Sequence, residues 1–262
     1  MLYRTSGDKI VDLAPMSSAE LAPFRKEIQM IFQDPFGSLN PRMTLFDNVG
    51  EPLLVNGMRN RRERMDRVAE LLRLVGLRPE FMHRFPHAFS GGQRQRIGIA
   101  RALATSPRLV VADEPVSALD VSVQAQVLNL LLELQSRLRL TFLFVAHDLS
   151  VVRHICDRVA VMYVGRLVEL APTDAVFSRP RHPYTAALMR AVPVPDPRVS
   201  GMDAILKGEV PSPASPPSGC YFHPRCPFAE ERCQREAPAL QEVTPGHFAR
   251  CHFAAELDLA IH

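Results

Sequence analysis

Two short, continuously apolar runs constrain the fold of this chain more than any other feature. They lie in the predicted strands 109–112 and 141–146, the second of which begins with Thr141, and each stops at a polar side chain, Asp113 in the first case and His147 in the second. Apolar runs of this length suit strands that are buried on both faces of a parallel sheet. The segment between them predicts a long helix over residues 121–139. Strands that alternate with helices in this way indicate an α/β domain with a largely parallel sheet.

Other segments fit the same pattern. Residues 27–32 predict a further strand, which ends at Gln33, and residues 60–75 predict a helix whose apolar side chains recur at helical spacing. A second helix is expected over residues 93–104, and residues 159–169 predict a hairpin. Polar residues therefore follow several of the strands. Because ligands of open α/β sheets bind at the carboxyl ends of the strands, we expect a site there.

A glycine pair stands directly in front of the predicted 93–104 helix, in the sequence Ser90-Gly91-Gly92-Gln93. Glycines let the backbone approach a ligand closely, at an entropic cost that needs a reason. The free N–H groups of a helix N-terminus form a ready anion site. The stretch therefore predicts a phosphate ligand.

Composition narrows the class of protein. The chain has 262 residues, of which 47% are hydrophobic, an ordinary share for a globular protein. A net charge of only +3 and the lack of a basic stripe argue against a nucleic-acid partner. No apolar run reaches the ~18 residues that a membrane span needs, and the N-terminal stretch MLYRTSGDKIVDL contains no apolar core of a secretory signal. We expect a cytosolic protein that reaches a membrane only through partners.

Taken in order along the chain, the polar signals resemble the ATP-binding subunit of ABC transporters. The matching pieces are the Q-loop residue Gln33, the signature motif FSGGQ, the Walker B strand LVVADE, the D-loop at residues 117–120 and the switch histidine His147. The resemblance covers residues 1–170, and its motifs are very specific as a set. It implies an ABC-type P-loop NTPase-like domain with a largely parallel sheet and a helical signature subdomain.

The resemblance also implies a role for each polar residue at the strand ends. Asp113 would help to hold Mg²⁺ through water and Gln33 would contribute an oxygen near the same ion, since Mg²⁺ prefers hard oxygens and keeps several waters. Glu114 would act as general base or would polarise the attacking water. His147 would touch the γ-phosphate and hold that water in line. ATP and Mg²⁺ are the cofactors implied.

The signature and the D-loop are implied to act across a dimer. By the resemblance, Ser90, Gly91 and Gly92 would bind the γ-phosphate of ATP held by a second ABC ATPase subunit, in a homodimer or a heterodimer. Gln93 of the signature and Asp120 of the D-loop complete the expected nucleotide-binding set.

One motif of the family does not occur in the 262 residues. The P-loop pattern G-x-x-x-x-G-K-[ST], whose backbone N–H groups cradle phosphates, is absent. The first residues resemble the strand and turn that follow the P-loop helix, so we expect an N-terminally truncated domain that lacks its first strands and its P-loop. Such a chain is not expected to bind ATP tightly alone. Whether it is an ATPase stays open, with a leaning toward the family's ATP hydrolysis.

Residues 171–262 resemble the C-terminal extension of oligopeptide and dipeptide ABC importer ATPases, a group whose pattern nickel importers largely share. The matching segments are FSRPRHPYTAALMRAVP, GCYFHPRCPFAEERC and, earlier in the chain, QDPFGSLNPRMT. Residues 191–219 hold seven prolines, which predicts a linker. We therefore expect two domains, residues 1–170 and residues 171–262, the second a small extension rich in cysteine and proline.

Four cysteines crowd this extension: Cys220, Cys226, Cys233 and Cys251. In a cytosolic chain such a group is more often metal-binding than disulfide-bonded. Thiolates ligate both [4Fe–4S] clusters and structural Zn²⁺. The C-x5-C-x6-C-x17-C spacing lacks the tight pairs that zinc sites usually show, so the prediction favours the cluster over Zn²⁺, with four free thiols as a third reading. Three nearby histidines stand as alternative ligands: His223, His247 and His252.

The predicted function is that of the energy-coupling subunit of an ABC importer for oligopeptides or dipeptides. Its partners would be a second ATPase subunit, two membrane permease subunits and, indirectly, an extracytoplasmic substrate-binding protein. It would lie peripherally at the cytoplasmic face of the cell membrane. The alternative is a catalytically inactive interaction subunit that only supplies the signature motif to a partner's ATP site.

Overall fold

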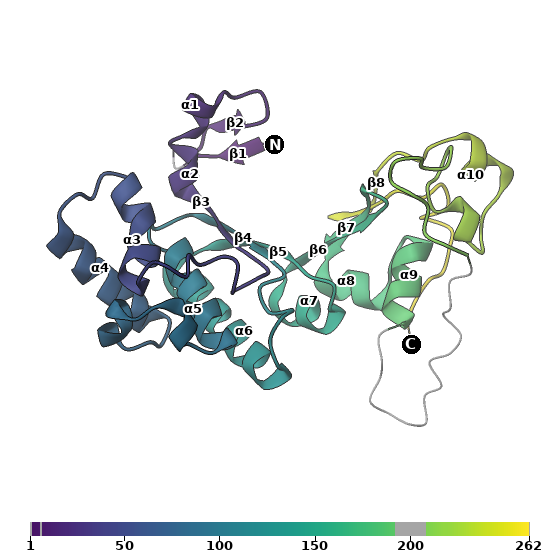
Figure 1. Cartoon of the computed structure of the whole chain (residues 1–262). Helices are drawn as coiled ribbons and strands as arrows, with labels where there is room; N and C mark the ends of the chain where they lie inside the picture. The colour runs from purple at the N-terminus through teal and green to yellow at the C-terminus, as the bar shows by residue number, and fades with distance from the viewer. Residues whose placement is uncertain (1, 6, 192–207, 262) are drawn as a thin grey trace. The chain divides into compact units, whose positions relative to one another are not determined.

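The structure is a computed structural model that describes residues 2–5, 7–191 and 208–261. Contacts divide the chain into two compact units, Met1–His147 and Asp148–His262 (Figure 1). Among the described residues, every strand pairs within its own unit.

A three-stranded parallel sheet forms the centre of the first unit. Its strands, in spatial order, are β3 (Ile28–Ile31), β4 (Leu109–Asp113) and β5 (Thr141–Val145). Ile31 pairs with Ala112, which pairs with Phe144, so the three strands end at one edge. Val110 and Ala112 of the central strand are fully buried. This arrangement confirms the predicted α/β fold with a parallel sheet.

One face of β5 departs from the prediction of a strand buried on both sides. Leu143 is 53% exposed and Val145 is 45% exposed, and Thr141 on the same face is exposed as well. The same face is only half-buried on the neighbouring strand β4, at Leu109 and Val111. The prediction of two buried faces is therefore wrong for β5 and only partly met on β4, because an apolar run does not reveal how many sides of a strand are covered.

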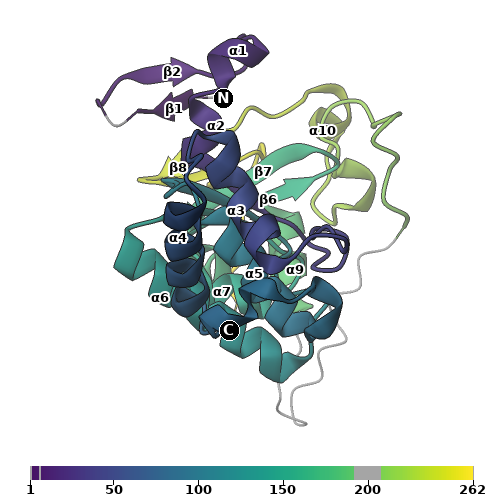
Figure 2. The ribbon, with the colours of Figure 1, turned by 60° about the vertical axis from the view of Figure 1, so that its left-hand side comes forward.

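Three helices pack against one another in the first unit: α3 (Leu45–Val55), α4 (Arg61–Leu74) and α5 (Gly91–Ala102) (Figures 1 and 2). Val68, Leu71 and Leu72 form the fully buried stripe of α4, at the spacing that predicted this helix. Gly76 follows its end with φ +74°, a left-handed conformation that glycine adopts without strain. This group is the helical subdomain that the resemblance implied.

The remaining elements of the first unit connect or flank this core. Helix α6 (Val121–Leu138) packs on α5, and the short 3-10 helices η1 (Pro79–His83) and η2 (Pro86–Ala88) lead into α5. The N-terminal part consists of an antiparallel pair and two short helices: β1 (Leu2–Arg4), β2 (Ile10–Asp12), α1 (Ser18–Leu21) and α2 (Phe24–Glu27).

The second unit is built on a four-stranded antiparallel sheet in the order β6-β7-β9-β8. Its strands are β6 (Arg158–Tyr163), β7 (Arg166–Pro172), β8 (Gln241–Thr244) and β9 (His247–Ala249). Its helices are α7 (Leu149–Ile155), α8 (Thr173–Ser178), α9 (Pro183–Arg190), η4 (His223–Arg225) and α10 (Glu231–Arg235). The predicted hairpin is confirmed as β6 and β7, which join through Val164 and Gly165 at φ +46° and +73°.

The contact division at His147–Asp148 lies upstream of the predicted domain boundary at residue 170. The difference arises because β7 pairs with β9, so that the hairpin packs with the C-terminal residues. The extent of the two domains stays a prediction. Of the predicted linker at 191–219, residues 192–207 lie outside the described residues.

Candidate functional site

Three of the predicted polar residues meet at the carboxyl edge of the parallel sheet, and we call them the strand-edge cluster: Gln33, Glu114 and His147. Gln33 Nε2 donates a hydrogen bond to Glu114 Oε2 at 2.7 Å, although the two residues lie 81 positions apart. His147 Nδ1 lies 3.0 Å from Glu114 Oε1. Each residue follows a different strand, so the parallel register brings them together.

The cluster holds Glu114 as an anion. The hydrogen bond with His147 keeps the pKa of the Glu114 carboxyl below its ordinary value, and burial opposes this effect only in part. The imidazole of His147 remains 71% exposed, whereas the Glu114 side chain is 23% exposed. An ionised carboxylate with both oxygens engaged and an open imidazole beside it can position and activate a water molecule.

Asp113 and Asp120 lie where the sequence predicted, but outside the cluster's hydrogen bonds. Asp113 is the half-buried last residue of β4. Asp120 is the exposed N-cap residue of α6, and its side chain makes no capping hydrogen bond. The structure thus joins only part of the predicted set by direct contacts among the described residues.

The signature residues form the N-terminus of α5. The Ser90 side chain accepts a hydrogen bond from the Gln93 N–H at 3.4 Å, and the Ser90 N–H donates to Gln93 Oε1 at 3.1 Å. This reciprocal capping box uses the Gln93 side chain to satisfy the helix end. The expected role of Gln93 in nucleotide binding stays a prediction, and a structural role stands beside it.

The glycine pair has a packing role that the sequence did not reveal. A Cβ atom on Gly92 would lie 2.4 Å from Val123 Cγ1 of α6, which is closer than atoms can approach. A Cβ on Gly91 would lie 3.5 Å from Leu119, an ordinary contact. Gly92 therefore allows α5 to approach α6, whatever its role toward a ligand.

Two arginines of α5 bind the segment that follows Gln33, and sequence reasoning missed them. The Arg94 guanidinium lies 4.3 Å from the centre of the Phe36 ring, and Arg94 Nε donates to the Phe89 carbonyl at 3.0 Å. Arg101 donates to the Ser38 carbonyl. The arginines of the run QRQRIGIAR were visible in the sequence, but no pattern indicated which backbone carbonyls they reach.

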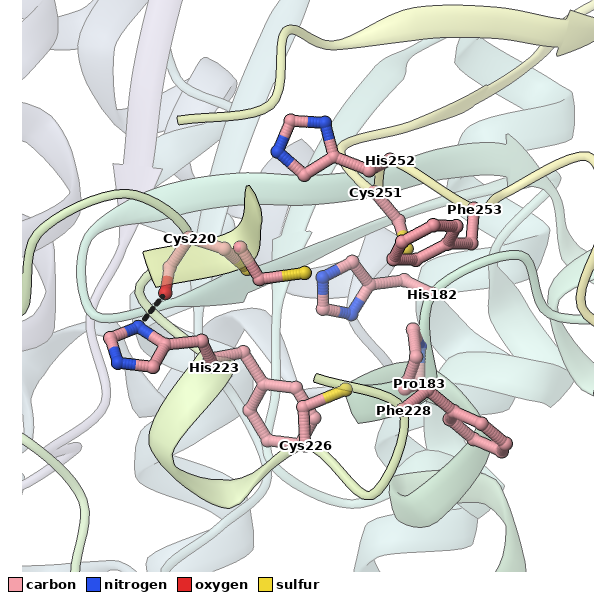
Figure 3. A pocket seen from close by; sticks show the side chains of 11 residues that line it. His182, Pro183, Cys220, His223, Cys226, Phe228, Cys251, His252 and Phe253 are labelled. Carbon is pink, nitrogen blue, oxygen red and sulfur yellow. Dashed lines mark hydrogen bonds between the residues drawn. The ribbon is translucent and has the colours of Figure 1, made fainter. Parts of the chain in front are cut away.

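In the second unit, all four tail cysteines line one pocket, the cysteine pocket (Figure 3). Two of the histidines predicted as alternative ligands, His223 and His252, line it as well. His247 does not: its Nε2 lies 2.7 Å from Glu169 Oε1, and both side chains are buried. As the side chains stand, no group of three or more His, Cys, Asp or Glu residues in the described part of the chain is gathered around a single metal-ion position.

Three thiols of the cysteine pocket, those of Cys220, Cys226 and Cys251, are held in their protonated form when no cation is bound. Burial raises the pKa of Cys220, raises that of Cys226 to about 11 and raises that of Cys251 to about 12. Repulsion among the thiolates adds to the effect of burial. Such thiols ionise only when a bound cation compensates the charge.

A histidine that the sequence analysis did not assign also faces this pocket. His182 is 1% exposed, and burial lowers its pKa to about 3, so the ring is neutral. It was visible in the HPYT piece, but only as a family marker, because no spacing pattern connects it with the cysteines.

Two family models match the chain. The model described as "ABC transporter" matches residues 1–117, and the one described as "Oligopeptide/dipeptide transporter, C-terminal region" matches residues 168–233. No described helix combines the length and apolar character needed to cross a membrane.

Curated relatives carry corresponding names. The probable peptide ABC transporter ATP-binding protein y4tS of Sinorhizobium fredii is 53% identical over 254 residues, which cover 96% of this chain and 72% of that protein. The oligopeptide transport ATP-binding protein AppF of Bacillus subtilis is 54% identical over 258 residues, which cover 96% of this chain and 78% of AppF.

Solved structures agree on the fold. CbiO1 from Clostridium perfringens, part of the ABC transporter complex cbiONQ, matches with a TM-score of 0.57 and 29% identity over 65% of each chain. The ATP-binding cassette MJ0796, in a dimeric post-hydrolysis state with ADP and Pi, matches with a TM-score of 0.55 and 31% identity over 62% of this chain and 70% of that one. Together with the strand-edge cluster and the capped signature helix, these likenesses establish that the chain belongs to the family of peptide ABC transporter ATP-binding proteins.

Proposed function

We propose that the chain is the energy-coupling subunit of an ABC importer for oligopeptides or dipeptides, in which ATP hydrolysis within a subunit dimer drives uptake. The observation that carries the proposal is the convergence of Gln33 and His147 on Glu114, at 2.7 and 3.0 Å. Phosphoryl transfer depends mainly on positioning and charge stabilisation, which such a cluster can supply to an attacking water. The substrate class comes from the names of relatives such as AppF.

In this proposal each residue of the sheet edge has a separate task. Asp113 and the amide oxygen of Gln33 offer the hard oxygen ligands that Mg²⁺ prefers, and bound Mg²⁺ would neutralise phosphate charge. Glu114 orients the attacking water and accepts its proton. His147, whose imidazole is largely exposed, contacts the γ-phosphate.

The signature end of α5 acts toward the nucleotide of a second subunit. Ser90 is exposed, and the capping box keeps its hydroxyl at the helix N-terminus. Because Gly91 and Gly92 carry no side chains of their own, none covers their N–H groups in the first turn. The alternative function uses this half alone: the chain would supply the signature to a partner's ATP site and take no part in hydrolysis itself.

Paired substitutions separate the two functions in a complex reconstituted with its partner ATPase and permease subunits. If Glu114 serves as the base, E114Q lowers the ATPase rate per complex by about 10²-fold or more, and S90A lowers it too. If the chain supplies only the signature, S90A lowers the rate and E114Q leaves it unchanged. E133Q, an exposed carboxylate on α6, is the matched control. Wild-type rates for both S90A and E114Q would contradict both functions.

For the cysteine pocket we propose a [4Fe–4S] cluster, with Zn²⁺ as the alternative. The donor set supports it, since four cysteines line one pocket and the thiols of Cys220, Cys226 and Cys251 need a cation to ionise. A single tetrahedral Zn²⁺, with Zn–S bonds of about 2.3 Å, requires its sulfurs within about 3.8 Å of each other. A cluster binds each thiolate at a separate iron and so suits thiols spread around the wall of a pocket.

The metal is tested by purifying the protein without oxygen and measuring iron, acid-labile sulfide and zinc per chain. Iron and sulfide in equal amounts, with absorbance near 400 nm, would support the cluster. One zinc ion per chain without iron would show that Zn²⁺, and not the cluster, occupies the pocket. A preparation with neither metal, including after reconstitution with ferrous iron and sulfide, would leave four free thiols as the correct reading.

The proposed location is the cytoplasmic face of the cell membrane, where two permease subunits hold the chain peripherally. Co-expression with the permeases should move the protein from the supernatant to the membrane pellet. It should be released by high pH but not by salt alone, as a subunit bound through protein contacts would be. Unchanged distribution on co-expression would argue against this location.

A further inference from the structure

His182 carries a proton donor that no described residue satisfies. Its Nδ1 accepts a hydrogen bond from the Tyr184 N–H at 3.1 Å, which caps the N-terminus of α9. A ring nitrogen that accepts a hydrogen bond bears no proton, so the single proton of the neutral ring lies on Nε2. No acceptor for Nε2 is recorded in the described part of the chain, although the side chain is 1% exposed.

The direction of this donor is fixed by the surrounding structure. The buried Glu169 carboxylate accepts the main-chain N–H of His182 at 3.0 Å and that of Arg181 at 2.7 Å. The Phe222 ring lies 5.7 Å from the imidazole. In Figure 3 the ring extends into the cysteine pocket with one nitrogen toward the sulfur of Cys220, and both residues line that pocket.

We propose that His182 Nε2–H donates a hydrogen bond to a sulfur atom of the group that the four cysteines bind. The inference rests on the proposed function of the pocket as the site of an iron–sulfur cluster. The Nε2–H group faces the cysteine pocket without a recorded acceptor, and a cluster with its thiolate ligands would provide sulfur acceptors at this place. His182 is thus a positioning residue of the pocket and not one of its ligands.

The hydrogen bond has a measurable consequence for the cluster. Reduction adds negative charge to the sulfurs, so a donor aimed at them stabilises the reduced form more than the oxidised form. Loss of the donor should lower the midpoint reduction potential without loss of iron, because all four cysteine ligands remain.

Two substitutions distinguish the role of Nδ1 in the α9 cap from the role of Nε2 as a donor. H182N retains an acceptor near the position of Nδ1, so it keeps the α9 cap, but has no group at the position of Nε2. H182Q reaches the position of Nε2 with an amide N–H but loses the cap. We expect H182N to lower the midpoint potential and to remove one exchangeable-proton coupling from the spectrum of the reduced cluster. H182Q should retain a potential close to that of the wild type.

The outcomes distinguish this inference from the proposal on which it rests. A wild-type chain without iron overturns both. A wild-type chain that binds iron but shows no exchangeable-proton coupling beyond that of H182N overturns the role of His182 and leaves the cluster in place. An unchanged midpoint potential in H182N likewise overturns the role of His182 and leaves the cluster in place. If H182N does not retain the cluster, the comparison of wild type with H182Q decides. A midpoint potential in H182Q close to that of the wild type supports the role of the donor, and a clearly lower potential overturns it, because H182Q retains an N–H at that position.

Discussion

Glu114 occupies a backbone conformation that its residue type seldom adopts, with φ +43°. The Glu114 N–H donates to the Val145 carbonyl at 2.9 Å, and Ser117 Oγ donates to the Glu114 carbonyl at 3.1 Å. These contacts hold Glu114 in a strained conformation at the point where its carboxylate faces the sheet edge. Strained backbone conformations are common at functional sites. The residue type after an apolar strand predicted Glu114 as a site residue. The strain could not be predicted, because it depends on a neighbouring strand.

Substitution of His147 by alanine tests the electrostatic link within the strand-edge cluster. The pKa of Glu114 should rise toward its ordinary value, because the hydrogen bond with His147 is the main cause of its depression. A depressed folded-state pKa means that the stability contributed by Glu114 is present above the unfolded-state pKa and is lost as pH falls through the folded-state pKa. H147A should therefore lose less stability than the wild type over that acid range.

The measurement is the pH titration of the ¹³C carboxyl signal of Glu114. H154A, which removes an exposed histidine of α7, is the control and should leave the midpoint unchanged. An equal midpoint in H147A and wild type would show that the contact does not perturb the carboxyl.

At the scale of elements, the α5–α6 contact shows which part of a motif the sequence could not explain. The sequence predicted a helix that begins at Gln93, whereas α5 begins two residues earlier, at Gly91, with Ser90 as its N-cap. The close approach of Gly92 to Val123 could not be predicted, because it depends on how two helices cross in space. The same limit applies to Arg101, whose partner, the Ser38 carbonyl, lies 63 positions away.

The packing role of Gly92 predicts a difference between two glycines of α5. G92A should destabilise the first unit by about 1–3 kcal/mol, since the new methyl group overlaps Val123. G98A should stabilise it by about 0.5–1 kcal/mol, because a Cβ there meets no atom within 4 Å and alanine favours the helix. Urea unfolding measures both changes. Equal stabilities of the two variants would contradict the crowding at Gly92.

Glu169 joins three elements of the second unit. Besides the two N–H groups before α9, its carboxylate meets His247 Nε2 of β9 at 2.7 Å, and it is fully buried on β7. E169Q should destabilise the unit by about 2–4 kcal/mol, because an amide places its own N–H against these donors. E236Q, which removes only an exposed pair with Arg232, should change stability by less than about 1 kcal/mol.

Hydrogen exchange of the β9 amides reports on E169Q without a global unfolding experiment. Faster exchange in β9 together with the first turn of α9 is expected, because Glu169 holds both. Faster exchange in α7 alone would argue against this link.

At the scale of the whole molecule, local patterns predicted the strands and helices better than their grouping. The apolar run at 109–112 and the helical spacing of Val68, Leu71 and Leu72 depend on neighbours along the chain, and both were confirmed. The pairing of β7 with β9 joins segments about 80 residues apart, and nothing in the sequence of either strand indicates it. The convergence of the four cysteines on one pocket was predicted as a hypothesis from composition, but the buried donor of His182 beside them was not.

If the cysteine pocket holds the proposed metal group, the division into two units predicts that removal of this group acts on only one of them. All residues that line the cysteine pocket belong to the unit Asp148–His262, and a ligand stabilises the structure to which it binds. Oxidative removal of the group with a chelator should therefore speed amide exchange in α9 and α10 by about tenfold or more, while α3, α4 and α5 change little. The chelator-treated C233S variant is the control, because it already lacks one ligand and should show a smaller response. Equal acceleration of amide exchange in both units would mean that they unfold as one body. Unchanged amide exchange in α9 would mean that the group in the pocket does not contribute to the stability of this fold.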